Sequence, residues 1–179
     1  MQENAFLELC LHRQSCRDFS DRPVKQETLM KCVEAARLAP SGCNGQPWSF
    51  VVVETPETVS EVSACAQQMG MNSYIANASA FIVILEEHAV LMPALRKIID
   101  SQYFAKGDLG IATAHICLMA ESLSLGTCVV GIYDREKICE LLHIPIEKQF
   151  GALIAVGYPH DNTVRLKNRK NLNDIVRFV

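Results

Sequence analysis

Residues 108–125 form the longest stretch of the chain that is apolar on nearly every side. Asp108 stands at its start as a natural N-cap, and Gly126 follows its end as a natural C′ residue. A helix that is apolar all round belongs in the middle of a domain rather than on its surface. His115 and Glu121 interrupt the stretch, and no charge-free apolar window reaches the roughly 18 residues that a membrane span requires. We therefore expect a buried central helix and no membrane span.

Short apolar runs elsewhere in the chain are typical of buried strands. They occupy residues 49–54, 80–85, 127–133 and 152–158. Because these runs are continuous rather than alternating, we expect both faces of the sheet to be covered. Helical spacing predicts the covering helices at about residues 4–12 (with Asn4 as its cap), 25–39, 57–69 and 134–143, and a short amphipathic helix within 87–106. This order indicates an α+β fold or a mixed sheet wrapped by helices.

The composition confines the chain to a folded protein of one domain. It has 179 residues, of which 49% are hydrophobic, and a net charge of −3. That apolar content excludes disorder, and the pI of about 5.9 argues against a general nucleic-acid binder. Glu3 and Glu8 bracket the first apolar run, which is unlike the pattern of a signal peptide.

The cysteine pattern indicates a reducing compartment. There are 8 cysteines, yet no C-x-x-C motif occurs and no histidine lies at ligand spacing from a cysteine. A zinc or iron–sulfur site is therefore not expected. In a chain of this size such cysteines act as small hydrophobic residues, which predicts reduced thiols in a cytoplasmic protein.

Two basic clusters lie at opposite ends of the chain. Arg13, Ser15 and Arg17 would point the same way in an extended segment, and two guanidinium groups with a hydroxyl are suited to a phosphate dianion. The second cluster, residues 167–170, lies some 150 residues further on. Taken alone, each cluster is better explained as a solvated basic segment, and the spacing does not show whether the two converge.

The segment from Pro40 to Trp48 is a defined loop between a helix and a strand. Ser41, Asn44 and Gln46 supply the donors and acceptors that the heterocyclic edge of a cofactor requires. An ordinary helix-to-strand turn with its tryptophan packed in the core explains the loop equally well. The usual dinucleotide, phosphate-loop, serine-hydrolase and zinc-protease motifs are absent from the chain.

Taken together, these segments resemble the nitroreductase family of FMN-dependent oxidoreductases over almost the whole chain. Each segment is weak alone, but they follow in the family's order. They are RQSCRDF (13–19), APSGCNGQPWSFVVV (39–53), Asn72 ahead of ANASAFIVI, DLGIATAHICLMAESLSLGTCVVGIYD (108–134), GALIAVGYP (151–159) and KNRKNL (167–172). The chain departs from the family at Gln14, Val130 and Asn171, which bears on substrate and nicotinamide preference more than on FMN binding.

The resemblance implies a central mixed, mainly antiparallel sheet wrapped by helices, in an intertwined homodimer with FMN at the interface. The phosphate and ribityl contacts would be Arg13, Ser15, Arg17, Lys167 and Arg169, with Arg17 reaching toward the pyrimidine end of the ring. Residues 160–179 would form an extension that contributes to this site and to the dimer. The other subunit would contribute Pro40, Ser41, Gly42 and Asn44. Asn72 would lie at the pyrimidine edge, and the backbone N–H groups of Val130 and Gly131 would face flavin N5.

The activity implied by the resemblance is oxidation of NADH or NADPH and reduction of a nitroaromatic, quinone or similar electron-poor acceptor, in ping-pong order. Flavin N5 would be the reactive centre, and no side chain would be a nucleophile. Tyr103 and Phe104 are only weak candidates for the lining of the acceptor pocket. Three alternatives stay open at this point: other flavin chemistry on the same scaffold (dehalogenation, enone reduction or flavin breakdown), a non-catalytic flavin-binding protein, and a small α+β protein without a cofactor.

Overall fold

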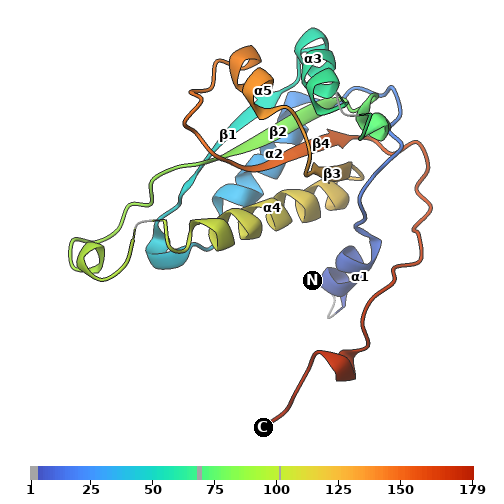
Figure 1. Cartoon of the computed structure of the whole chain (residues 1–179). Helices are drawn as coiled ribbons and strands as arrows, with labels where there is room; N and C mark the ends of the chain where they lie inside the picture. The colour runs from blue at the N-terminus through green and yellow to red at the C-terminus, as the bar shows by residue number, and fades with distance from the viewer. Residues whose placement is uncertain (1–3, 68–69, 101) are drawn as a thin grey trace.

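An antiparallel sheet forms the centre of the computed structural model, which describes residues 4–67, 70–100 and 102–179 (Figure 1). Its strands are β1 (Trp48–Val53), β2 (Ala80–Glu86), β3 (Gly126–Val130) and β4 (Phe150–Gly157), in the order β1-β2-β4-β3. Ser15 adds a parallel bridge to Thr127 at the open edge of β3. The mainly antiparallel sheet expected from the family resemblance is confirmed.

Helices cover both faces of the sheet, as the continuous apolar strands predicted. The helices α2 (Gln26–Arg37) and α4 (Ala105–Ser122) lie on one face, and α3 (Pro56–Gln67) and α5 (Arg135–Leu141) lie on the other (Figure 1). Successive residues of β2 show the division: Phe81 packs in the core under α3 and α5, whereas Ile82 packs in the core under α2 and α4. Both cores are therefore built by the two-residue alternation of the strands.

The central helix is shifted from its predicted limits. Helix α4 begins at Ala105, so Asp108 lies in its first turn and is not the N-cap. The helix ends at Ser122, and Ser124 takes the left-handed conformation (φ 59°) that was expected of Gly126, which is the first residue of β3. Only the sheet-facing side of α4 is buried, and Ile111 on its outer side is exposed.

Other element limits also differ from the sequence-based expectation. The amphipathic helix expected within 87–106 is not formed by the described residues of 87–104. Their one helical element is a 3₁₀ turn at Leu95–Lys97, and Ile98 is exposed. Helix α3 ends at Gln67, and the predicted end at Met69 lies outside the described residues. The side chain of Asn4 makes no capping hydrogen bond to α1 (Ala5–His12). No helix within the described residues is both long and apolar enough to cross a membrane.

The two ends of the chain expose apolar surface. Helix α1 is rich in apolar residues, yet none of its residues is buried. Residues 160–179 extend away from the body of the molecule with only a 3₁₀ turn at Leu172–Asp174, and Leu166 and Phe178 are almost fully exposed (Figure 1). The chain exposes 11406 Å², whereas a compact monomer of 19.9 kDa exposes about 8,700 Å².

Candidate functional site

The segment Arg13–Arg17 lies along the open edge of β3. The N–H of Cys16 donates to the carbonyl of Thr127 at 2.8 Å, beside the Ser15 bridge. A Cβ on Gly126 would fall 2.6 Å from the Cβ of Cys16, so only glycine permits this approach. The first basic cluster is thus held in an extended conformation by the sheet itself.

The structure brings the two basic clusters together around one cavity of about 340 Å³. Among the described residues of its lining, every charged side chain is a cation. The lining comprises Arg13, Gln14, Ser15, Arg17, Arg165, Leu166, Lys167, Asn168 and Arg169, and we call this set the cationic cradle. The convergence that sequence spacing left open is therefore present within a single chain.

Lys167 connects the cationic cradle to the end of α1. Its ammonium group donates to the carbonyls of Cys10 at 2.9 Å and Arg13 at 2.6 Å, and also to that of Leu11. These acceptors lie at the carboxyl end of α1, where a cation is favoured by the helix dipole. Burial lowers the pKa of Lys167, and the positive charges of Arg13 and Arg169 lower it further.

Arg165 is a member of the cationic cradle that the sequence analysis missed. Its backbone N and its Nε both donate to Oε1 of Gln14 at 3.1 Å, and its Nη2 donates to the carbonyl of Ser15. An arginine at this position carries no local pattern that distinguishes it from the solvated residues around it. Only the path of residues 160–179 beside the segment Arg13–Arg17 reveals its contacts.

Tyr74 lies between Asn72 and Arg17 and contacts both side chains. The guanidinium of Arg17 lies 5.6 Å from the centre of the Tyr74 ring, and the Tyr74 hydroxyl donates to Oδ1 of Asn72 at 2.7 Å. The Nδ2 of Asn72 donates to the carbonyls of Ala66 at 2.9 Å and Ile132 at 2.8 Å. The Asn72 side chain therefore joins α3 to the segment that follows β3.

Val130 and Gly131 lie at the end of β3, on the same strand whose beginning receives Cys16. The Val130 side chain is buried in the core under α3 and α5, and Gly131 is exposed just beyond the strand. Because Thr127 directs its backbone carbonyl to the open edge, the alternation of the ladder directs the backbone groups of Val129 to that edge as well.

A larger cavity of about 630 Å³ adjoins the same segment, and its charge is mixed. Acidic residues, among them Asp18, Glu121 and Asp161, share its lining with Arg17 and Arg165. The cationic cradle is therefore the better site for an anion. Across the described residues, no group of three or more His, Cys, Asp or Glu side chains is arranged to hold a metal ion.

The loop from Pro40 to Gln46 lies elsewhere, against the beginning of α4. The N–H of Gly42 donates to both carboxylate oxygens of Asp108, at 3.0 and 3.1 Å, and Asp108 is 5% exposed. Three residues of the loop that are not glycine have positive φ: Cys43 (53°), Asn44 (54°) and Gln46 (46°). Such backbone is held only where the surroundings fix it.

Helix α4 separates this loop from the cationic cradle. Asp108 holds the loop near the beginning of the helix, whereas Glu121, which lines the larger cavity beside Arg17, lies near its end. At 1.5 Å per residue these two positions are about 20 Å apart. Within one chain the structure therefore does not bring Pro40, Ser41, Gly42 or Asn44 to the cradle.

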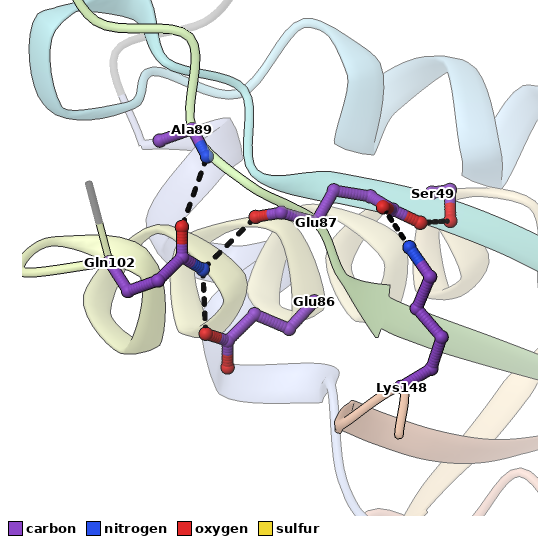
Figure 2. Close-up of polar contacts among 6 residues, drawn as sticks. All are labelled: Ser49, Glu86, Glu87, Ala89, Gln102 and Lys148. Carbon is purple, nitrogen blue, oxygen red and sulfur yellow. Dashed lines mark hydrogen bonds and ion pairs between the residues drawn. The ribbon is translucent and has the colours of Figure 1, made fainter. Parts of the chain in front are cut away.

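A polar cluster at the end of β2 fastens the described residues of 87–104 beside this loop (Figure 2). Nε2 of Gln102 donates to Oε1 of Glu86 at 2.7 Å and to the carbonyl of Glu87 at 3.0 Å, while its Oε1 accepts the N–H of Ala89 at 3.1 Å. The fastened segment leads to Phe104, whose ring lies so close to Gly42 that a Cβ there would be 2.6 Å away.

The Glu87 carboxylate secures the other side of this cluster. It pairs with the Lys148 ammonium and accepts a hydrogen bond from the Ser49 hydroxyl at 2.7 Å (Figure 2). These two contacts lower the pKa of Glu87, in that order of size. The cluster thus joins β1, β2 and the residues before β4.

We expect Asp108→Ala to destabilise the protein by about 2 kcal/mol, because the Gly42 N–H loses its acceptor in a buried place. Asp108→Asn retains one oxygen and should cost about half as much. Urea unfolding measures the free energy, and hydrogen exchange should quicken at residues 42–46. Asp21→Ala, at an exposed carboxylate, is the control; equal effects of Asp21→Ala and Asp108→Ala would contradict the role given to Asp108.

We expect Glu87→Gln to destabilise the protein by about 1 kcal/mol at pH 7, and the difference from wild type to shrink on acidification. The folded-state pKa of Glu87 is lowered, so its contribution is present above the unfolded pKa and is lost as pH falls through the folded value. Thermal unfolding between pH 7 and 3 tests this, with the exposed Glu140→Gln as control. A difference independent of pH would exclude an ionic contribution.

The comparisons with known proteins agree with this architecture. The nitroreductase family model matches residues 11–158. A protein of Archaeoglobus fulgidus, whose name refers to an NADH dehydrogenase/NAD(P)H nitroreductase, is 34% identical over 159 residues, which is 87% of this chain and 86% of the relative. The oxygen-insensitive NADPH nitroreductase of Helicobacter acinonychis is 27% identical, over 96% of this chain and 95% of its own.

A solved structure extends the likeness to three dimensions. The FMN-dependent nitroreductase from Clostridium difficile R20291 superimposes with a TM-score of 0.73 at 28% identity, over 96% of this chain and 98% of that chain. Because the family model covers most of the chain and a relative of similar length exceeds 30% identity, the sequence and the fold lead to one assignment. The chain belongs to the nitroreductase family.

Proposed function

We propose that the cationic cradle binds the phosphate of FMN and that the chain is an FMN-dependent oxidoreductase. The observation that carries the proposal is a cavity in which every charged lining residue is a cation. Arg13 and Arg169 supply forked N–H donors, Ser15 supplies a hydroxyl, and Lys167 adds charge from the end of α1. This donor set fits a phosphate dianion.

FMN, when bound, supplies two-electron redox chemistry at N5 of its ring. The chain's own residues bind and orient it: Arg17 and Asn72 are assigned to the pyrimidine end, and Gly131 at the end of β3 to the N5 side. The ladder turns the backbone groups of Val130 toward β4, so the contribution expected of its N–H is not retained in this assignment. NADH or NADPH is the proposed donor, and a nitroaromatic, quinone or similar electron-poor molecule is the proposed acceptor. The two would use the site in turn, which gives ping-pong kinetics. The relatives named for NAD(P)H nitroreductase activity support this assignment.

We propose further that the working unit is a homodimer with two shared sites. The loop from Pro40 to Asn44 lies too far from the cationic cradle to complete the site within one chain, so a second copy would supply it. The exposed apolar residues of α1 and of residues 160–179 are the surface that a second copy would cover. The cysteines are all free, which suits the proposed cytoplasmic location.

The cofactor assignment predicts that Arg13→Ala with Arg169→Ala raises the Kd for FMN at least about 100-fold, because two charge-assisted contacts are lost. Quenching of FMN fluorescence on titration measures the Kd, and circular dichroism confirms folding. The control, Lys25→Ala with Lys31→Ala, removes equal charge from exposed positions on and beside α2. An unchanged Kd in the cradle variant would overturn the phosphate assignment.

The shared site predicts complementation between two defective chains. One carries Arg13→Ala and Arg169→Ala, and the other carries Ser41→Ala and Asn44→Ala. In a heterodimer the intact cradle of the second chain meets the intact loop of the first, so one site per dimer should bind FMN as wild type does. Heterodimers isolated through two different affinity tags are titrated with FMN. If each site lay within a single chain, every site in these heterodimers would be defective.

A further inference from the structure

We propose that Gln14 is a positioning residue that holds the two halves of the cationic cradle in a fixed position relative to each other. The inference rests on the proposed FMN function and deepens it. Gln14 stands between Arg13 and Ser15, in the half of the cradle that the sheet holds. The other half is the tail, which we define as residues 160–170, and it contributes Lys167 and Arg169.

Both ends of the Gln14 amide are engaged with the tail. Its Nε2 donates to the carbonyl of Thr163 at 2.9 Å, across 149 residues of sequence. Its Oε1 accepts from the backbone N and from the Nε of Arg165, each at 3.1 Å. The Nη2 of Arg165 continues to the carbonyl of Ser15, next to Gln14 in the chain. One amide therefore fastens two tail residues to the held segment.

The tail needs such a fastening because it has no regular structure and carries like charges. Residues 161–170 form no helix or strand, and Leu166 is 101% exposed, so little apolar burial holds them. Burial lowers the pKa of Lys167 most, and repulsion from the positive charges of Arg13 and Arg169 lowers it further. Fixing this arrangement before an anion arrives removes an ordering cost from binding.

A glutamine is required for this pattern of contacts. Glutamate accepts from Arg165 but offers no donor to the Thr163 carbonyl, and it brings negative charge into the cradle. Methionine has a similar length and no charge but loses the hydrogen bonds, so it separates the fastening from electrostatics. The chain also offers a matched control in Gln149, an exposed glutamine whose Nε2 bonds to the carbonyl of Glu147, two residues away.

The experiment is an FMN titration of the full-length protein in four variants: Gln14→Met, Gln149→Ala, Arg169→Ala and the double variant Gln14→Met with Arg169→Ala. We expect Gln14→Met to raise the Kd about tenfold and Gln149→Ala to leave it within about twofold. Because Gln14 acts through the tail, which still supplies Lys167, its loss should have a smaller effect once Arg169 is removed, below about fivefold. A tenfold effect that persists in the double variant would mean that Gln14 contacts the cofactor directly, and it would overturn the inference.

A second measurement does not depend on FMN. Trypsin cleaves after lysine and arginine, which the tail supplies at Arg165, Lys167, Arg169 and Lys170. In the full-length protein without added FMN, Gln14→Met should quicken cleavage in the tail several-fold, whereas Gln149→Ala should not. Equal cleavage rates would overturn the fastening role of Gln14. If the wild-type protein binds no FMN, and its tail is still cleaved more slowly than that of Gln14→Met, the proposed function is refuted and the fastening role of Gln14 is supported.

Discussion

Repulsion among cations is the constraint on which the site depends. Arg13, Arg17, Arg165, Lys167 and Arg169 line one cavity, and none of the described residues in its lining is acidic. Assembling like charges costs free energy, and the fold offsets part of it with backbone dipoles: carbonyls at the end of α1 accept from Lys167, and the Ser15 carbonyl accepts from Arg165. A structural role would be served better by cations paired with carboxylates. The remaining positive potential is explained by an anionic ligand, which is why a protein without a cofactor is the weakest of the alternatives.

The central helix determines how the rest of the site must be assembled. The cationic cradle lies near the end of α4, and the loop with Gly42 lies near its beginning. The buried carboxylate of Asp108 holds that loop to the helix. Because a helix is rigid on this scale, movement within one chain does not bring the two together. The proposed second copy of the chain would supply the missing loop. It also explains why α1 is apolar yet has no buried residue.

The sequence predicted the sheet well because its signal is local. The runs at 80–85 and 152–158 are continuous and apolar, and they became the two central strands. The predicted start of α4 was wrong because the Asp108 carboxylate, which by residue type is a good N-cap, instead accepts the N–H of Gly42, 66 positions away in the sequence. The amphipathic spacing in 87–106 was misleading because Gln102 and Glu87 fasten that segment through tertiary contacts. Likewise, the two basic clusters were visible in the sequence, but the contact between Gln14 and the tail depends on the folded path.

The strained loop and the fastened segment beside it serve a common purpose. Positive φ at Cys43, Asn44 and Gln46 costs free energy. Part of the compensation comes from within the loop, where the N–H of Gln46 donates to the Ser41 hydroxyl at 3.0 Å, and part comes from Asp108 and from the Phe104 ring against Gly42. Phe104 lies two residues after Gln102, which the polar cluster holds (Figure 2). A loop that is held so firmly but makes no contact with the cradle of its own chain is already shaped for a surface that this chain does not provide, which is what a site shared between two copies requires.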